Sequence, residues 1–343
     1  MKMKAMVLEE FNRPLAMREV EVPPLEAGEV LLEVKACGLC QTDLKIVAGK
    51  IPPPIIRLPH IMGHEVAGQV ARVGQGVEDF SEGDRAVAAV YITCGNCEAC
   101  QRGEENLCER LKRLGFEAPG GYAQYLNVPA RNLIPLDPSI PLEQAAILPD
   151  AVATVYHAIC HLGKVKAGDS VLTVGVGGLG GHAVQIARLS GARVIAADIK
   201  QERLAFAREM GADEVIDTGG GNPLEAVKEL TGGRGVDRVV EIVGHPETLR
   251  WSLPCLRPGG LLILVGYAPG EPFPLDSMAM HYHEWKIVGS RCCTRIELRQ
   301  VVELVKEGKI RPILARTYPF EEANEALERV RRGDIIGRAV LTF

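Results

Sequence analysis

The stretch Ser170-Val171-Leu172-Thr173-Val174-Gly175-Val176-Gly177-Gly178-Leu179-Gly180 decides the fold of one half of the chain. Its apolar run predicts a strand over Ser170–Val174, and the glycines that follow are typical of the turn that receives a dinucleotide between a strand and a helix. Gly175 permits the tight turn, Gly177 lets the backbone approach a pyrophosphate, and Gly180 lets the next helix pack on the strand. The positive end of that helix is expected to face the phosphates.

The sequence after this turn alternates between apolar strands and helical stretches. Strands are expected at Ser170–Val174, Arg193–Ala197, Glu214–Ile216, Arg238–Val243, Leu261–Val265 and Lys286–Val288. Helices are expected at Leu179–Leu189, Glu202–Met210, Pro223–Leu230 and Glu247–Leu256. Strand–helix alternation of this length predicts an α/β Rossmann fold, that is, a doubly wound parallel sheet.

An acidic residue, Asp198, follows the second of these strands. A carboxylate at this place can accept hydrogen bonds from ribose hydroxyls and would repel a 2′-phosphate, so the sequence favours NAD over NADP. Gly178 and Leu179 complete the turn and join the three other glycines as candidate cofactor-binding residues. The competing interpretation is a plain strand–helix turn, which the surrounding alternation disfavours.

In the half of the chain before residue 150, the sequence pattern predicts a β-rich region. Short apolar runs such as Val30–Val34 and Val66–Val70 are interrupted by Gly and Pro turns. A helix is expected at Ala151–Leu162, where the β-rich pattern gives way to alternating strands and helices. The segment from about Ser290 reads as helices and a final strand, Arg338–Phe343; it is too short for a third domain, so we expect it to fold back onto the first.

Composition excludes several classes of protein. The 343 residues are 47% hydrophobic and 24% charged, and the net charge of −5 gives no electrostatic case for binding nucleic acid or an anionic membrane. No run of 18 apolar residues appears, so a membrane-spanning helix is not expected. Met1–Glu10 reads as an opening strand and not as a signal peptide, which predicts a cytoplasmic protein.

Four of the ten cysteines lie close together in the sequence, as Cys94, Cys97, Cys100 and Cys108. In a chain of this size without an export signal, such crowding indicates metal rather than disulfides. Four thiolates in one loop can close a tetrahedral shell around Zn²⁺, which makes a structural site without an open position. An iron–sulfur cluster is the alternative, but no proline follows the fourth cysteine and no second cluster motif exists.

Further candidates are scattered: Cys40, Thr42 and Asp43, then His64 and Glu65, and finally Asp150. Each residue alone is weak evidence for a functional site, because a single His is more often a plain residue than a ligand and an Asp after Pro often caps a helix. Taken with the glycine turn and the cysteine lobe, however, they occur in the order found in one family. The chain resembles the zinc-containing medium-chain alcohol dehydrogenases along nearly its whole length.

This resemblance implies a β-rich GroES-like catalytic domain at residues 1–151 and 290–343, which carries the cysteine lobe at 94–108. It also implies an NAD-binding Rossmann domain at residues 152–289. The activity implied is zinc-dependent, NAD-linked hydride transfer between an alcohol and NAD, giving an aldehyde or ketone. Two Zn²⁺ ions per subunit, a small-molecule alcohol substrate and a homo-oligomer, a tetramer or dimer, are implied as well.

Ligand roles follow from the resemblance residue by residue. Cys40 matches the thiolate ligand of the catalytic zinc and His64 the imidazole ligand. Asp150 stands where the family often has a third Cys and other members have Asp or Glu. Glu65 is a nearby or alternate ligand. Three ligands with a fourth open position suit a Lewis acid.

Supporting roles follow in the same way. Asp43 would hydrogen-bond the far ring nitrogen of His64 and fix its tautomer. Thr42 resembles the hydroxyl that relays the substrate proton, and Arg338 the arginine that contacts the pyrophosphate. The relay often ends in a His five residues after the ligand Cys, but here that residue is Lys45, which leaves the proton's exit open. Closure of a cleft between the domains is expected to gate the reaction.

The remaining cysteines, Cys37, Cys160, Cys255, Cys292 and Cys293, match no ligand position and are interpreted as structural or incidental, and His60 as a plain histidine. The substrate stays open. A polyol, sugar or amino-alcohol dehydrogenase, threonine-like, is the first alternative. A non-enzymatic zinc- or NAD(H)-binding regulator is another, disfavoured together with a zinc-free quinone reductase because the ligand set is intact.

Overall fold

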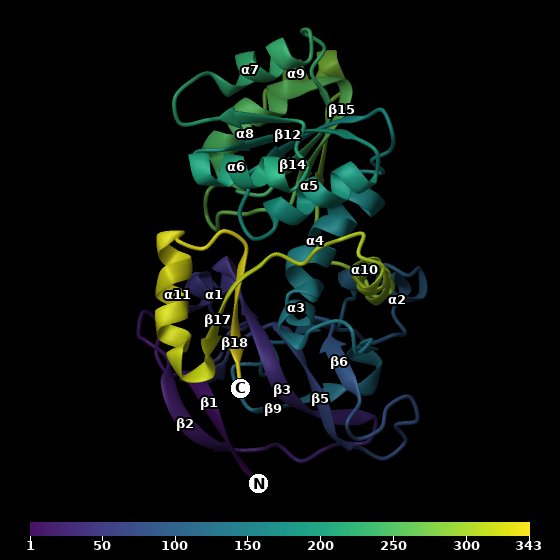
Figure 1. The fold of residues 1–343 in the computed structure, drawn as a ribbon, viewed down its shortest axis with the longest axis vertical. Coiled ribbons are helices and arrows are strands. Elements are labelled where there is room, and N and C mark those ends of the chain that lie inside the picture. The colour runs from purple at the N-terminus through teal and green to yellow at the C-terminus, as the bar shows by residue number, and fades with distance from the viewer. The chain divides into compact units, whose positions relative to one another are not determined.

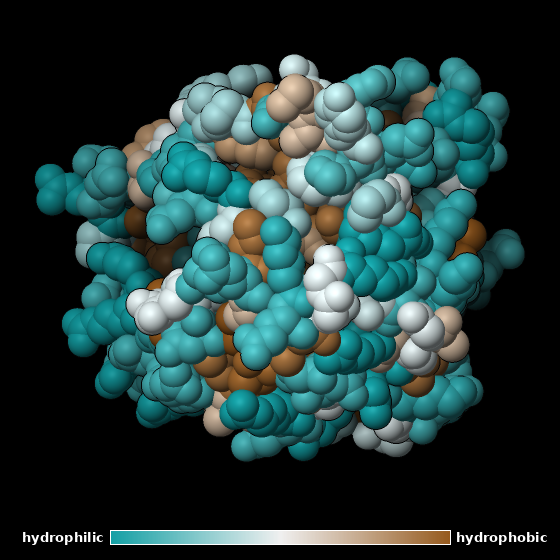
Figure 2. Space-filling model, turned by 90° about the horizontal axis from the view of Figure 1, so that it is seen from above, coloured by the Kyte–Doolittle hydropathy of each residue, from teal (hydrophilic) through white to brown (hydrophobic).

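The computed structural model describes all residues, 1–343, and divides them into two compact units (Figure 1). One unit comprises Met1–Ala153 with Cys293–Phe343, and the other Thr154–Cys292. The face drawn in Figure 2 is largely hydrophilic, with hydrophobic residues in small patches. None of the helices has the length and apolar character needed to span a bilayer.

The unit Thr154–Cys292 contains the predicted parallel sheet. Its strands are β11 (Ser170–Val174), β12 (Arg193–Asp198), β13 (Glu214–Asp217), β14 (Val236–Glu241), β15 (Leu256–Leu264) and β16 (Lys286–Gly289). They are hydrogen-bonded in the order β13-β12-β11-β14-β15-β16, and every pair is parallel. The order reverses its direction at β11, which is the switch point of a doubly wound fold. The predicted fold class is confirmed.

The helices of this unit are α5 (Gly180–Leu189), α6 (Gln201–Glu209), α7 (Pro223–Leu230), α8 (Pro246–Ser252) and α9 (Ser277–His283). Several predicted bounds are wrong: β15 begins at Leu256 and not at Leu261, and two further differences have a clear physical cause. The helix expected to reach Leu256 ends at Ser252, because Pro254 lacks the N–H that a continuing helix needs and the chain turns into β15. The strand expected to reach Val243 ends at Glu241, because a turn with Gly244 at φ 73° follows.

The other unit contains three antiparallel or mixed sheets. The largest has the order β10-β6-β5-β3-β18-β17, with β9 also on β3. Its strands are β3 (Glu29–Leu39), β5 (Glu65–Val73), β6 (Arg85–Ala88), β9 (Tyr125–Pro129), β10 (Leu133–Pro135), β17 (Leu314–Pro319) and β18 (Arg338–Thr342). A small sheet joins β1 (Lys2–Leu8), β2 (Ala16–Glu21) and β4 (His60–Ile61), and β7 (Tyr91–Ile92) pairs with β8 (Lys112–Arg113).

The last segment of the chain lies in this unit. Strand β18 pairs antiparallel with β3, so that Leu341 lies opposite Cys37. The helices α10 (Arg295–Lys306) and α11 (Ala323–Arg332) precede it. The parallel strand β17 was not predicted, because Leu314–Pro319 lacks a continuous apolar run and exposes four of its six residues.

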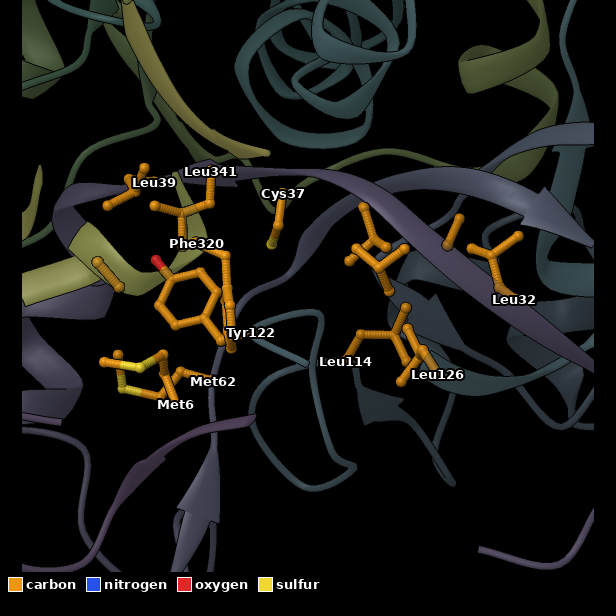
Figure 3. Close-up of a cluster of buried hydrophobic side chains, with 14 of the residues drawn as sticks. Met6, Leu32, Cys37, Leu39, Met62, Leu114, Tyr122, Leu126, Phe320 and Leu341 are labelled. Atoms are coloured by element: carbon orange, nitrogen blue, oxygen red, sulfur yellow. The ribbon is translucent and has the colours of Figure 1, made fainter. Parts of the chain in front are cut away.

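The core of this unit includes Tyr122, which is fully buried beside Met6, Met62 and Phe320, while Leu114 lies next to Leu126 (Figure 3). Side chains from strands far apart in sequence meet here, including the end of the chain at β18. Each large apolar side chain buried in this way stabilises the unit by about 1.5–3 kcal/mol. The core therefore provides a rigid platform beneath β3 and β5, the strands that carry the site described next.

Candidate active site

The four cysteines of the lobe converge in space. Cys97 begins the short helix α2 (Glu98–Gln101), and Cys108 follows a 3₁₀ turn. The four Sγ atoms lie within 4.8 Å of one another, with 3.9 Å between Cys94 and Cys100 and 3.5 Å between Cys97 and Cys100. Zn–S bonds of about 2.3 Å in a tetrahedron place sulfurs about 3.8 Å apart. The cluster therefore fits a closed zinc site.

The surroundings of these thiols also fit a cation. The backbone N–H groups of Cys94 and Cys97 donate to the sulfurs of Cys108 and Cys94, at 3.3 Å each. The N–H of Asn96 is the main cause that lowers the pKa of Cys94 to about 6, whereas burial raises the pKa of Cys100 to about 12. Crowded thiols thus share their protons unequally, and a dication would let all four ionise. None of the ten cysteines forms a disulfide.

Two arginines tie the lobe to the rest of its unit, and one of them, Arg131, donates to the carbonyl of Cys94 at 3.4 Å. Arg295, at the start of α10, forms an ion pair with Glu105 at 3.0 Å and donates to the carbonyl of Arg131 at 2.6 Å. A local metal loop is thereby fixed to a helix that comes much later in the sequence.

A second group of possible ligands comes from three separate elements. Cys40 lies between β3 and helix α1 (Gln41–Val47), as the N-cap of that helix. His64 and Glu65 lie at the start of β5, and Asp150 lies in a π-helical turn, Leu148–Val152. Their ligand atoms lie within 4.8 Å of one another. The Oδ2 of Asp150 is 3.5 Å from Cys40 Sγ and 3.9 Å from His64 Nε2. These distances suit one tetrahedral ion.

The π-helical turn gives Asp150 its position. The helix expected at Ala151–Leu162 begins earlier, at Leu148, and runs as a π turn, the α-helical Ala153–Tyr156 and a second π turn, His157–Leu162. Single π turns inside helices are rare and are frequent at functional sites. Here the turn directs a carboxylate toward the ligands on β3 and β5.

Asp43 lies behind His64. Its Oδ1 is 3.5 Å from His64 Nδ1, while its Oδ2 accepts hydrogen bonds from the N–H of Cys40 at 2.8 Å and from the hydroxyl of Tyr122 at 3.1 Å. Nε2, the other ring nitrogen, faces Cys40 and Asp150. The arrangement leaves the histidine atom nearest the cluster available for a metal.

Arg338 was not expected among these residues. Its guanidinium is buried and lies 2.5 Å from Asp150 Oδ2 and 3.0 Å from Glu65 Oε1. Glu65 is fully buried beside Gly38, where a Cβ would lie 1.9 Å from its Oε2, so only glycine leaves room for this carboxylate. An arginine at this point supplies the positive charge that the buried Glu65 and the half-buried Asp150 require.

The pKa values of Glu65, Asp150 and His64 depend on burial and on the charges that surround these residues. Burial raises the pKa of Glu65 well above its ordinary value. Burial would also raise the pKa of Asp150, but His64 and Arg338 outweigh it and hold that pKa well below its usual range. For His64, burial favours the neutral ring, yet Asp43 and Asp150 raise its pKa well above the ordinary value. The pocket is thus built to hold a positive charge at its centre.

The other predicted residues lie near this cluster. Thr42 and Lys45 are on α1, half-buried, and burial lowers the pKa of Lys45. Phe116, which sequence reasoning missed, places its ring 5.4 Å from that of His64. His60 is buried and its Nε2 lies 2.9 Å from the carbonyl of Gly115, as expected for a plain histidine. Neither Phe116 nor Tyr122 stands in a motif that would reveal it.

The glycine turn in the other unit has the shape that a dinucleotide needs. Gly175 has φ 90°, and a Cβ on Gly180 would lie 2.0 Å from the carbonyl oxygen of Gly175. A Cβ on Gly177 would meet no atom within 4 Å, so the backbone there is open to a ligand. Asp198 Oδ2 accepts from the N–H of Val176 at 2.7 Å, which ties the end of β12 to the turn.

Comparison with known proteins identifies the chain. Residues 26–138 match the alcohol dehydrogenase GroES-like domain, and residues 178–307 match the zinc-binding dehydrogenase domain. An alcohol dehydrogenase of Geobacillus stearothermophilus is 37% identical over 99% of both chains. An NAD-dependent alcohol dehydrogenase of Sulfolobus acidocaldarius is 34% identical over 99% of both. The solved alcohol dehydrogenase of Aeropyrum pernix is 36% identical, with a TM-score of 0.94 over 99% of this chain and 100% of that one.

The fold and the ligand clusters together define a zinc-binding dehydrogenase of the nucleotide-dependent kind. The chain belongs to the zinc-containing medium-chain alcohol dehydrogenase family.

Proposed function

We propose that this chain is an NAD-linked alcohol dehydrogenase whose catalytic zinc is held by Cys40, His64 and Asp150. The observation that supports this most directly is that the ligand atoms of the buried Cys40 and His64 and the half-buried Asp150 lie close together, with Asp43 behind the imidazole and Arg338 beside the carboxylate. Three protein ligands leave one coordination position open, as a catalytic zinc site requires.

Zn²⁺ bound there supplies a Lewis acid that lowers the pKa of an alcohol hydroxyl, and NAD supplies the hydride acceptor. The chain's own residues orient and balance these groups. Asp43 fixes the ring of His64 with Nε2 toward the ligand cluster, and Arg338 neutralises the excess carboxylate charge of Glu65 and Asp150. Thr42 receives the proton of the substrate hydroxyl, and Lys45, further along the same helix, occupies the position at which the family's relay often has a histidine.

The direct test is NAD reduction with a panel of primary, secondary and polyhydroxy alcohols, threonine included, together with elemental analysis of the purified protein. We expect two zinc ions per chain and turnover of at least one simple alcohol. Turnover of threonine or a polyol alone would favour the corresponding alternative. Zinc and NADH binding without turnover of any alcohol would favour a regulator, and a single zinc, or iron with visible absorbance, would overturn the assignment.

NAD preference is proposed to depend on Asp198. A carboxylate beside the 2′-phosphate of NADP would cost on the order of 1–3 kcal/mol through like-charge repulsion. Replacing Asp198 with Gly or Ser should therefore lower the ratio of kcat/KM for NAD to kcat/KM for NADP. Asp198→Glu, which keeps the charge, is the matched control. Equal use of both cofactors by the unchanged protein would contradict the proposal.

We also propose a homo-oligomer in the cytoplasm. Met278 and Tyr282 are 66% and 76% exposed on α9, which contacts β15, the neighbour of the edge strand β16, and exposed apolar side chains favour association. Ten cysteines without a disulfide favour a reducing compartment. Light scattering coupled to size-exclusion chromatography should give the mass of a dimer or tetramer, and a monomer would contradict the first part.

A further inference from the structure

Three loops meet at the carboxyl edge of the parallel sheet, where ligands bind in folds of this class. They are the glycine turn after β11, the turn Ile242–Gly244 after β14 and the turn Val265–Tyr267 after β15. A Cβ on Gly175 would lie 2.8 Å from a methyl of Val243, and a Cβ on Gly266 would lie 2.1 Å from the carbonyl oxygen of Ile242. The middle turn is therefore in contact with both of its neighbours, and a shift in it would move the glycine turn.

Glu241 holds this middle turn. Its carboxylate accepts hydrogen bonds from the N–H of Gly244 at 2.6 Å and from the hydroxyl of Thr248 at 2.8 Å, while its backbone oxygen accepts from Val265 and Gly266 at 2.8 and 3.0 Å. The residue is completely buried. One side chain thus connects the end of β14, the turn that follows it and the first turn of α8.

We propose that Glu241 is a positioning residue for the cofactor: by fixing the turn Ile242–Gly244 against Gly175, it keeps the glycine turn in the shape that binds NAD(H). The inference rests on the proposed use of NAD. Glu241 does not itself contact the cofactor in this account. It acts through the backbone of the turn, whose apolar residue Val243 remains 46% exposed next to Gly175.

The effect of the hydrogen bonds of Glu241 can be measured separately from the effect of its charge. Burial raises the pKa of Glu241 to about 6, and the groups that face it are the Thr248 hydroxyl, the N–H groups of Val243 and Gly244, and the more distant His245, itself paired with Glu271 at 3.0 Å. Thr248 also donates to the carbonyl of His245 at 2.9 Å. A glutamine at 241 can accept from Gly244 and donate to the Thr248 oxygen, so it preserves the connection without a charge.

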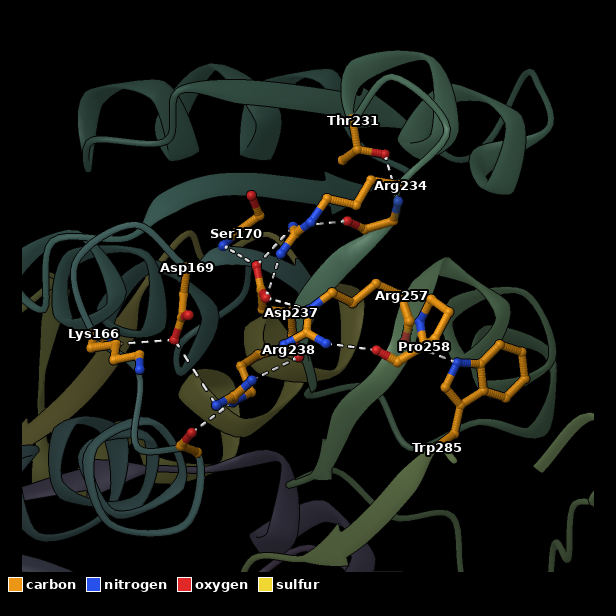
Figure 4. A network of polar contacts seen from close by, with 12 residues as sticks. Lys166, Asp169, Ser170, Thr231, Arg234, Asp237, Arg238, Arg257, Pro258 and Trp285 are labelled. Carbon is orange, nitrogen blue, oxygen red and sulfur yellow. Dashed lines mark hydrogen bonds and ion pairs between the residues drawn. The ribbon is translucent and has the colours of Figure 1, made fainter. Parts of the chain in front are cut away.

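The opposite end of the same strand offers a matched control. Asp237, at the amino end of β14, is equally surrounded by donors: Arg234 at 2.8 Å, Arg257 at 2.5 Å and the N–H of Ser170 at 2.9 Å (Figure 4). It is also buried. Breaking this network should weaken the same sheet without touching the edge that receives the cofactor.

The experiment measures the Kd of NADH by nicotinamide fluorescence, with no alcohol present, alongside thermal melts. Glu241→Ala should weaken NADH binding by about tenfold or more, because buried donors lose their acceptor. Glu241→Gln should bind within about threefold of the unchanged protein. Asp237→Asn should lower the melting temperature with an unchanged Kd. In turnover assays, Glu241→Ala should raise the KM for NAD and leave the KM for the alcohol unchanged.

Thr248→Val provides a second route if Glu241→Ala fails to fold: it should weaken NADH binding by a few-fold, and Thr248→Ser should restore it. A folded Glu241→Ala protein with an unchanged Kd would overturn the proposal. Equal losses in Glu241→Ala and Glu241→Gln, or a loss in Asp237→Asn as large as either, would do so as well. Failure of the proposed function is distinct, because the unchanged protein would then either bind no NADH or bind it without oxidising any alcohol.

Discussion

The two ligand clusters of this chain bring together the same number of donors within the same distance, yet they are built in different ways. Cys94, Cys97, Cys100 and Cys108 come from one loop, are all thiols and lie partly exposed at Cys94 and Cys100. The cluster of Cys40, His64, Glu65 and Asp150 comes from β3, β5 and a π turn and is mixed in its donors. Only the second is surrounded by Asp43, Tyr122 and Arg338.

The difference shows how the ligand set distinguishes a structural metal site from a catalytic one. Four thiolates more than neutralise a dication and fill its shell, so nothing further can bind. Cys40 and Asp150 with a neutral His64 just balance that charge and leave a position open. The cost is a pocket of buried carboxylates, which Arg338 compensates.

The most severe test of this contrast is Cys40→Ser. We expect turnover to fall by about a thousandfold, because the Lewis acid is lost, with little change in melting temperature. Alcohol oxidation and differential scanning calorimetry measure the two effects. A melting loss as large as that of Cys94→Ser would break the contrast.

Asp150→Asn tests whether the carboxylate is a ligand or only a helix cap. As a ligand, it should lose the catalytic zinc and about a hundredfold in turnover while the lobe keeps its zinc. Asp150→Cys should restore zinc binding with a different donor. A cap would cost at most about 1 kcal/mol of stability. An Asn variant with two zincs and full activity would leave Glu65 as the third ligand.

Cys94→Ser should have the opposite profile to Cys40→Ser. Loss of the lobe zinc removes folding free energy, so we expect a melting temperature lower by about 5–10 °C, with activity per folded molecule within about twofold. Zinc analysis should find one ion per chain. Activity that falls in proportion to lost zinc, without a thermal effect, would contradict the division of roles.

Chelation should separate the two ions by rate. A site with a carboxylate and an open position holds zinc less tightly than four thiolates, so 1,10-phenanthroline should remove the first zinc about tenfold faster than the second. Activity should disappear with the first ion, and the melting temperature should fall with the second. Simultaneous loss of both would show that the clusters do not differ in affinity.

How much of this could be predicted depends on the distance over which each feature is encoded. The cysteine lobe and the glycine turn are local, so their spacing alone indicated a metal and a dinucleotide. The dispersed ligands needed resemblance to a family, since Cys40 and Asp150 are 110 residues apart. The position of Arg338 beside Asp150, across 188 residues, follows from the pairing of β18 with β3, and no local pattern reveals it.

Smaller errors have the same origin. The end of β14 was placed two residues too late, because Ile242 and Val243 continue its apolar run and only the backbone shows the turn. Glu241 attracted no notice for the same reason: a glutamate at the end of an apolar strand has no spacing that distinguishes it. Its hydrogen bonds to the next turn become visible only in three dimensions.

The pairing of β18 with β3 has a consequence for how the protein is made. All four lobe cysteines have been synthesised by residue 108, but the strand that brings Arg338 beside Asp150 runs from Arg338 to Thr342, more than 200 residues later. At about 5–20 residues per second, the two events are separated by roughly 10 to 50 seconds. The lobe can therefore take up its ion during synthesis, many seconds before the strand that completes the charge balance of the second pocket has been made.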